Sequence, residues 1–195
     1  KIDRAAFCGC ESLKNITLPQ FLAVIRRDTF ARCSSLEQII MPPYITKIKN
    51  GCFYACKSLT KIIIPSSVIS IGSSSFAKCS SLKQVILPSS PIIIKNGVFE
   101  GCSSLTEIEL PFGMTSIRCG VFKQCSSLTH ITIPSSVTSI EKETFKDCIS
   151  LKEIIIPSSV TSIGDQAFEN CSALIQSPIH SSMISIEIHL FLDAY

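Results

Sequence analysis

The sequence predicts a β-rich α/β solenoid, one domain over residues 1–195 with eight 23-residue coils, short strands and short helical or 3₁₀ corners. Two observations carry this prediction. Cysteine, phenylalanine and leucine each recur every 23 residues from Cys10, Phe7 and Leu13, and no insertion or deletion interrupts the period. A unit this short cannot bury its own apolar side chains, so neighbouring units must stack and share one core.

An isoleucine column, beginning at Ile2, sets the coil boundaries. The predicted repeats are 2–24, 25–47, 48–70, 71–93, 94–116, 117–139, 140–162 and 163–185, with a degenerate end at 186–195. The pattern already weakens from Ser177, which replaces a strand isoleucine. Because solenoids need terminal caps, we expect the Ser177 to Tyr195 segment to cap one end. The first coil would leave an unpaired edge that favours self-association, and the chain looks cut from something longer.

Each coil predicts a strand, a turn, a second strand and a corner, best seen from residue 140 onward. Leu151 to Ile156 ends in alternating β-branched residues, typical of a short strand, and Pro157 closes it. Two serines then indicate a turn. Val160 to Ile163 reads as a second extended piece. Gly164 to Cys171 carries apolar residues at near-helical spacing, which predicts one or two turns of helix or 3₁₀.

Composition excludes several protein classes. Isoleucine and serine contribute 31 residues each and charged residues only 17%, unlike a disordered chain. Apolar runs such as Ile62 to Ile64 are far below the roughly 18 residues of a membrane span. A net charge of +3 is too weak to indicate nucleic acid binding. The first residues contain no signal peptide.

Eight of the eleven cysteines follow the 23-residue period. They recur once per coil instead of converging as metal ligands do, and stacked neighbours are spaced too widely for disulfides. We therefore expect small buried apolar side chains. Three cysteines lie outside this column and are predicted to be reactive or to cross-link chains: Cys8, Cys52 and Cys119.

Glu107, His130 and Glu153 occupy one column on successive coils. Such a stack permits a metal site or a pH-sensitive contact. Ligands in a straight row converge poorly, so a charge-compensated surface ladder is the favoured interpretation. No unique set of nucleophile, base and acid occurs, and we expect no catalytic residue, no metal and no cofactor.

The repeat resembles a known family. The strand element L-x-x-I-x-(I/L) is similar to leucine-rich repeats, and the fuller form IPSSVTSIGDQAFENCSALI at Ile156 to Ile175 resembles their BspA-like class. This resemblance implies a right-handed leucine-rich-repeat superhelix with a concave sheet face. It also implies non-enzymatic binding of macromolecules by surface proteins of host-associated bacteria or parasitic protists, linked to adhesion.

A partner should bind where the repeat is free to vary. Three successive isoleucines form an apolar strip among polar side chains, as in a protein contact, or they merely stabilise the sheet. Aromatic residues also replace serine at three turns. The predicted partner-binding residues are Ile40, Ile63, Ile86, Lys61, Gln84, Glu107, Glu109, His130, Phe21, Tyr44 and Phe112.

A second predicted surface is a basic column interrupted by Gly72. It favours an acidic protein or sulfated glycan, or it is a solvated face. Its members are Arg26, Lys49, Lys95 and Arg118.

The sequence thus predicts a non-enzymatic protein-binding repeat domain at the cell surface or outside the cell, which adheres to a host surface or matrix protein. The alternative is an intracellular scaffold or effector that binds a cytosolic partner through the same sheet, since many free thiols suit a reducing compartment.

Overall fold

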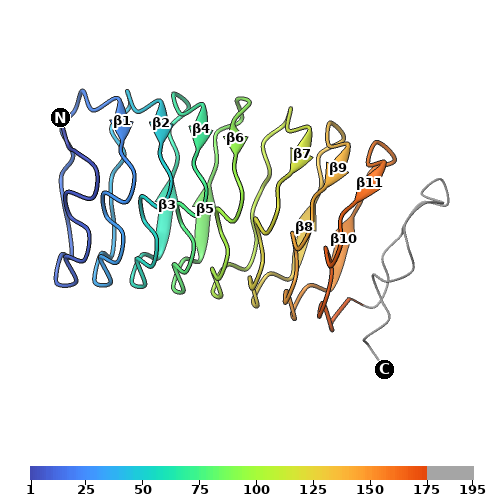
Figure 1. The fold of residues 1–195 in the computed structure, drawn as a ribbon. Coiled ribbons are helices and arrows are strands. Elements are labelled where there is room, and N and C mark those ends of the chain that lie inside the picture. The colour runs from blue at the N-terminus through green and yellow to red at the C-terminus, as the bar shows by residue number, and fades with distance from the viewer. Residues whose placement is uncertain (175–195) are drawn as a thin grey trace.

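The computed structural model describes residues 1–174 as a β-solenoid whose coils stack side by side from the N-terminus onward (Figure 1). Every strand pairing is parallel and joins equivalent residues of neighbouring coils, such as Ile48 with Ile71. The predicted stacking of 23-residue coils is therefore confirmed over this range. The predicted degenerate end, 186–195, and the Ser177 to Tyr195 cap lie outside the described residues.

The strands form two rows (Figure 1). A two-residue row contains β1 (Val24–Ile25), β2 (Lys47–Ile48), β4 (Ser70–Ile71), β6 (Ile93–Ile94), β7 (Ser116–Ile117), β9 (Ser139–Ile140) and β11 (Ser162–Ile163). A three-residue row contains β3 (Lys61–Ile63), β5 (Gln84–Ile86), β8 (His130–Thr132) and β10 (Glu153–Ile155). Both rows are interrupted, giving the sheets β1-β2-β4-β6, β7-β9-β11, β3-β5 and β8-β10. The strands lie where the sequence predicts them but are shorter.

The corners are not helical, which corrects the sequence prediction for residues 1–174. Each corner has two residues with positive φ four positions apart, for example Ser74 at 54° and Lys78 at 61°. A helix needs consecutive residues with negative φ. Alternate N–H groups therefore bond to the next coil, as Phe76 does to the Val98 carbonyl at 3.0 Å. The corners form a third inter-coil ladder.

The core is a set of side-chain ladders between the two strand rows and the corner. Phe30, Phe53, Phe76, Phe99, Phe122 and Phe145 are each fully buried. Neighbouring rings are stacked, and their centroids lie between 5.2 Å, for Phe53 and Phe76, and 5.9 Å, for Phe76 and Phe99. Among residues 1–174 there is no helix that is long and apolar enough to cross a membrane.

The cysteine column is buried from Cys33 to Cys148, as expected, but its thiols also donate hydrogen bonds. Cys79 Sγ donates to the Phe53 carbonyl at 3.1 Å, and the same bond recurs from coil to coil. Burial raises the pKa of the Cys79 thiol to about 12. The column is therefore both filler and hydrogen-bond donor.

Cys52 corrects another prediction. Its side chain is fully buried, and its thiol donates to the Arg26 carbonyl at 2.9 Å. Burial raises its pKa to about 12, so this cysteine is neither exposed nor activated. Cys8 is exposed and Cys119 is half-buried. Their predicted reactivity is not contradicted and stays a prediction.

Candidate binding face

The variable face of the three-residue row exposes alternate side chains. In β3 the side chains of Lys61 and Ile63 point outward while Ile62 is 1% exposed. Ile63 pairs directly with Ile86 of β5. Ile40, Ile63 and Ile86 are 82%, 53% and 40% exposed. They form one apolar strip across successive coils, called here the isoleucine strip.

Exposed aromatic residues lie at the turns that follow this face. The rings of Phe21 and Tyr44 stack with centroids 5.5 Å apart, and both are more than half exposed. Phe112 is 71% exposed on a later turn. The structure thus brings Phe21 and Tyr44 together and leaves Phe112 apart from them.

The strand ladders break around the coil that contains Glu107 to Leu110. β6 does not pair with β7, and no strand forms between β5 and β8. No backbone hydrogen bond is donated by the amides of residues 107–110 within the described chain. The Phe99 ring also lies 5.9 Å from both neighbouring rings, so the coils are more widely spaced here than elsewhere in the stack.

Pro91 provides a physical reason for the break. The equivalent valines donate their N–H across the turn, as Val68 does to the Pro65 carbonyl at 3.0 Å. Proline has no N–H to donate. The next inter-coil bond is displaced by one residue, because Ile93 bonds to Ile69 where the neighbouring coil uses Ile69 to bond Thr46.

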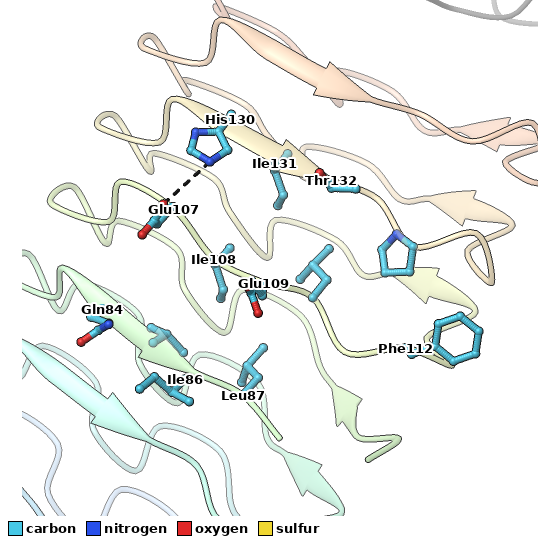
Figure 2. A pocket seen from close by; sticks show the side chains of 13 residues that line it. Gln84, Ile86, Leu87, Glu107, Ile108, Glu109, Phe112, His130, Ile131 and Thr132 are labelled. Atoms are coloured by element: carbon cyan, nitrogen blue, oxygen red, sulfur yellow. Dashed lines mark ion pairs between the residues drawn. The ribbon is translucent and has the colours of Figure 1, made fainter. Parts of the chain in front are cut away.

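A cavity of about 700 Å³ opens over the break. It is called here the sheet-break groove and is lined by Gln84, Val85, Ile86, Leu87, Glu107, Ile108, Glu109, Leu110, Phe112, His130, Ile131, Thr132 and Pro134. Figure 2 shows these side chains, which come from β5, from the unpaired segment and from β8. Six of the eleven predicted partner-binding residues line it: Gln84, Ile86, Glu107, Glu109, Phe112 and His130.

The electrostatics of the groove are dominated by two carboxylates. Glu107 Oε2 lies 3.8 Å from His130 Nε2 (Figure 2), and the Thr129 hydroxyl lies 3.1 Å from His130 Nδ1. Glu109 makes no ion pair with a described residue. Within residues 1–174, no three His, Cys, Asp or Glu side chains are grouped to hold a metal. The contact is a surface pair of His130 with one glutamate.

The basic column is partly compensated within the chain. Arg118 Nη1 lies 2.9 Å from Glu141 Oε1, and Arg26 Nε lies 3.7 Å from Asp3. Binding of an anionic glycan or acidic protein along Arg26, Lys49, Lys95 and Arg118 therefore stays a prediction, and no contact in the structure adds to it.

Comparison with known proteins identifies the repeat. The family model described as the BspA type leucine-rich repeat region matches residues 1–128 and 115–194, with six copies. The chain belongs to the BspA-type leucine-rich repeat family. The sequence resemblance is thereby confirmed, whereas the predicted count of eight coils is not. No curated protein matches this leucine-rich repeat chain.

Three solved leucine-rich repeat structures show the same architecture. One from T. pallidum is 30% identical, with a TM-score of 0.60 over 88% of this chain and 69% of that one. One from Bacteroides ovatus is 25% identical, with a TM-score of 0.52 over 88% and 68%. One from Eubacterium ventriosum is 28% identical, with a TM-score of 0.74 over 88% and 46%. This leucine-rich repeat chain spans less than half of the last protein.

Sequence reasoning missed the sheet-break groove in this leucine-rich repeat. It found Glu107, Glu109 and Phe112 as separate variable positions but not the break that gathers them. The available signal was Pro91, which replaces the valine of the turn seen at Val68 and Val137. A proline at a position whose N–H is otherwise hydrogen-bonded predicts a local loss of pairing.

Proposed function

We propose that this chain is a non-enzymatic protein-binding domain that acts at the cell surface in adhesion to a host surface or matrix protein. The isoleucine strip is the observation that carries the proposal. Three large apolar side chains stacked in the open are unfavourable in water unless another surface covers them. Polar neighbours such as Lys61 and Gln84 surround the strip, which is the usual composition of a protein contact with an apolar centre.

The exposed aromatic pair supports the same assignment. Phe21 and Tyr44 are stacked and more than half exposed. Large aromatic side chains contribute more binding energy than most residues when a partner excludes water from them. They need only two torsion angles to be fixed, so little entropy is lost on binding. The strip and the pair together provide the apolar centre of an interface.

The test is capture of a partner from host surface extract with immobilised protein, followed by measurement of Kd with the identified partner. Ile63→Glu should weaken binding at least about tenfold, because it places a charge in the apolar centre. Ile155→Glu is the matched control, because Ile155 shares the column and is 51% exposed but lies in the separate sheet β8-β10. Equal binding by both variants and the unmodified chain would contradict the proposal.

The second candidate, an intracellular scaffold or effector with a cytosolic partner, is favoured by the cysteines. All eleven lie in the described part of the chain and are unpaired, as in proteins of reducing compartments. Labelling intact source cells with a membrane-impermeant reagent distinguishes the two. Recovery of the labelled chain supports the surface role, and labelling only after lysis supports the intracellular role.

A further inference from the structure

The sheet-break groove contains a carboxylate with no charged partner. Glu109 is exposed, occupies the same column as Ile86 and Thr132, and makes no ion pair within the described residues. Glu107 beside it faces His130 at 3.8 Å. No lysine or arginine lines the cavity. The groove therefore has negative potential on a chain whose net charge is +3.

The walls around Glu109 are apolar. Ile86, Leu110 and Phe112 line the same cavity, and Phe112 projects at its end, beyond Glu109 (Figure 2). A carboxylate beside aliphatic and aromatic surface matches the amphipathic side chains of arginine and lysine. Their methylene stems pack on apolar groups while the charged head meets an anion, and an exposed aromatic ring adds a favourable contact for a cation.

The unpaired backbone adds polar groups. The amides of residues 107–110 donate no backbone hydrogen bond within the described chain. An extended segment of another protein has its own free N–H and C=O groups, which pair well with such a segment. A small isolated cation would leave the apolar walls and the free amides unused. The chemistry of the groove thus fits a basic peptide segment.

We propose that the sheet-break groove binds an extended segment of a partner protein through one arginine or lysine. The charged head meets the Glu109 carboxylate, and the stem packs on Ile86 and Phe112. This inference rests on the proposed protein-binding function and specifies the partner as one that presents a basic residue in an extended segment.

The experiment is an NMR titration of isotope-labelled protein with a short peptide of alternating serine and valine that contains one central arginine. The amide signals of residues 107–110 should shift. The same peptide with citrulline, which keeps the shape and loses the charge, should bind about threefold to tenfold more weakly. Glu109→Gln should weaken the arginine peptide by a similar factor and leave the citrulline peptide unchanged. Glu153→Gln, an exposed glutamate on β10 outside the groove, is the matched control.

Equal affinity for both peptides, or no effect of Glu109→Gln, would overturn the proposal. Dispersed amide spectra of the variants show that they remain folded. The Ile63→Glu capture experiment keeps the two claims separate. If capture depends on Ile63 while the peptides do not bind the groove, the protein-binding function stands and the basic segment is rejected. If the peptides bind as expected while Ile63→Glu captures its partner normally, the groove stands and the role of the isoleucine strip is rejected.

Discussion

At the scale of single residues, the buried cysteines act as hydrogen-bond donors that tie each coil to the one before. The Cys79 thiol and the Phe53 carbonyl make one such bond. Cys52 belongs to a second column of small donors, in which Thr29, Ser75 and Thr144 are also buried and bonded to backbone carbonyls. The sequence predicted the burial of the periodic cysteines from their spacing. It could not assign Cys52, because that column changes residue type from coil to coil.

Thiol labelling tests this placement. With Ellman's reagent on the native protein, Cys8 and Cys10 should react first because both are exposed. Cys52 and Cys79 should react only after unfolding in urea, because burial excludes the reagent and holds their pKa near 12. The double substitution Cys8→Ser, Cys10→Ser should remove the fast phase, and Cys52→Ser should leave it unchanged. A fast phase that disappears in Cys52→Ser would contradict the structure.

At the scale of the coil elements, strands were predictable and corners were not. Alternating β-branched residues before a proline determine a strand locally, as at Glu153–Ile155. At the corners, apolar spacing resembles a helix, but residues such as Ser74 adopt positive φ so that alternate amides reach the next coil. That choice depends on stacking, which a local pattern does not record. The ladder break likewise depends on how Pro91 and the next coil fit together.

Hydrogen exchange should reveal the ladder break. Arg118 lacks the inter-coil bond that its counterparts make, namely Lys95 to the Ile71 carbonyl at 3.1 Å and Glu141 to the Ile117 carbonyl at 2.8 Å. The Arg118 amide and the amides of 107–110 should exchange at least about tenfold faster than those two counterparts, because unbonded amides exchange without local unfolding. Exchange is measured by NMR, residue by residue. Equal protection of Arg118, Lys95 and Glu141 would show that the ladder is continuous.

Coil spacing also explains why Gly72 interrupts the basic column. A Cβ at this position would overlap the Asn50 amide nitrogen and approach the Lys49 carbonyl carbon to 2.7 Å. We expect Gly72→Ala to lower the free energy of unfolding by about 1–3 kcal/mol, because the backbones of adjacent coils must separate. Urea denaturation measures the change. Lys95→Ala, at the equivalent exposed position of the next coil, should change stability by less than about 0.5 kcal/mol. Equal effects would contradict the close approach.

At the scale of the whole molecule, the repeat converts one local environment into many. The 23-residue period was sufficient to predict stacking, the core columns and the outward face, because each coil contacts only its neighbours. The same repetition multiplies any property of a ladder position. Seven cysteines are fully buried, and burial raises the pKa of each thiol above the ordinary value of 9.0, as at Cys33 and Cys125. The titration of these thiols therefore acts on global stability.

The sign follows from proton counting. Above pH 9 the unfolded chain releases thiol protons, whereas the folded chain keeps them until its raised pKa values, about 11 for Cys33 and about 12 for Cys79. The unfolded state then binds fewer protons, so the free energy of unfolding falls as pH rises. This stabilisation is fully present below pH 9 and is lost between pH 9 and about 12. Each buried thiol contributes about 1.4 kcal/mol per pH unit in that window.

Because seven thiols act together, the loss should reach several kcal/mol per pH unit and unfold the protein between about pH 9 and 11, since domains are stable by only about 5–15 kcal/mol. Circular dichroism under reducing conditions measures the unfolding free energy in urea from pH 7.5 upward. Cys79→Ala should lower stability at pH 7.5 by about 1–3 kcal/mol, because the bond to Phe53 is lost, and should also reduce the slope with pH. Cys8→Ser should change neither. A free energy of unfolding that stays constant from pH 8 to 10.5 would show that the cysteine ladder does not keep its protons in the folded state.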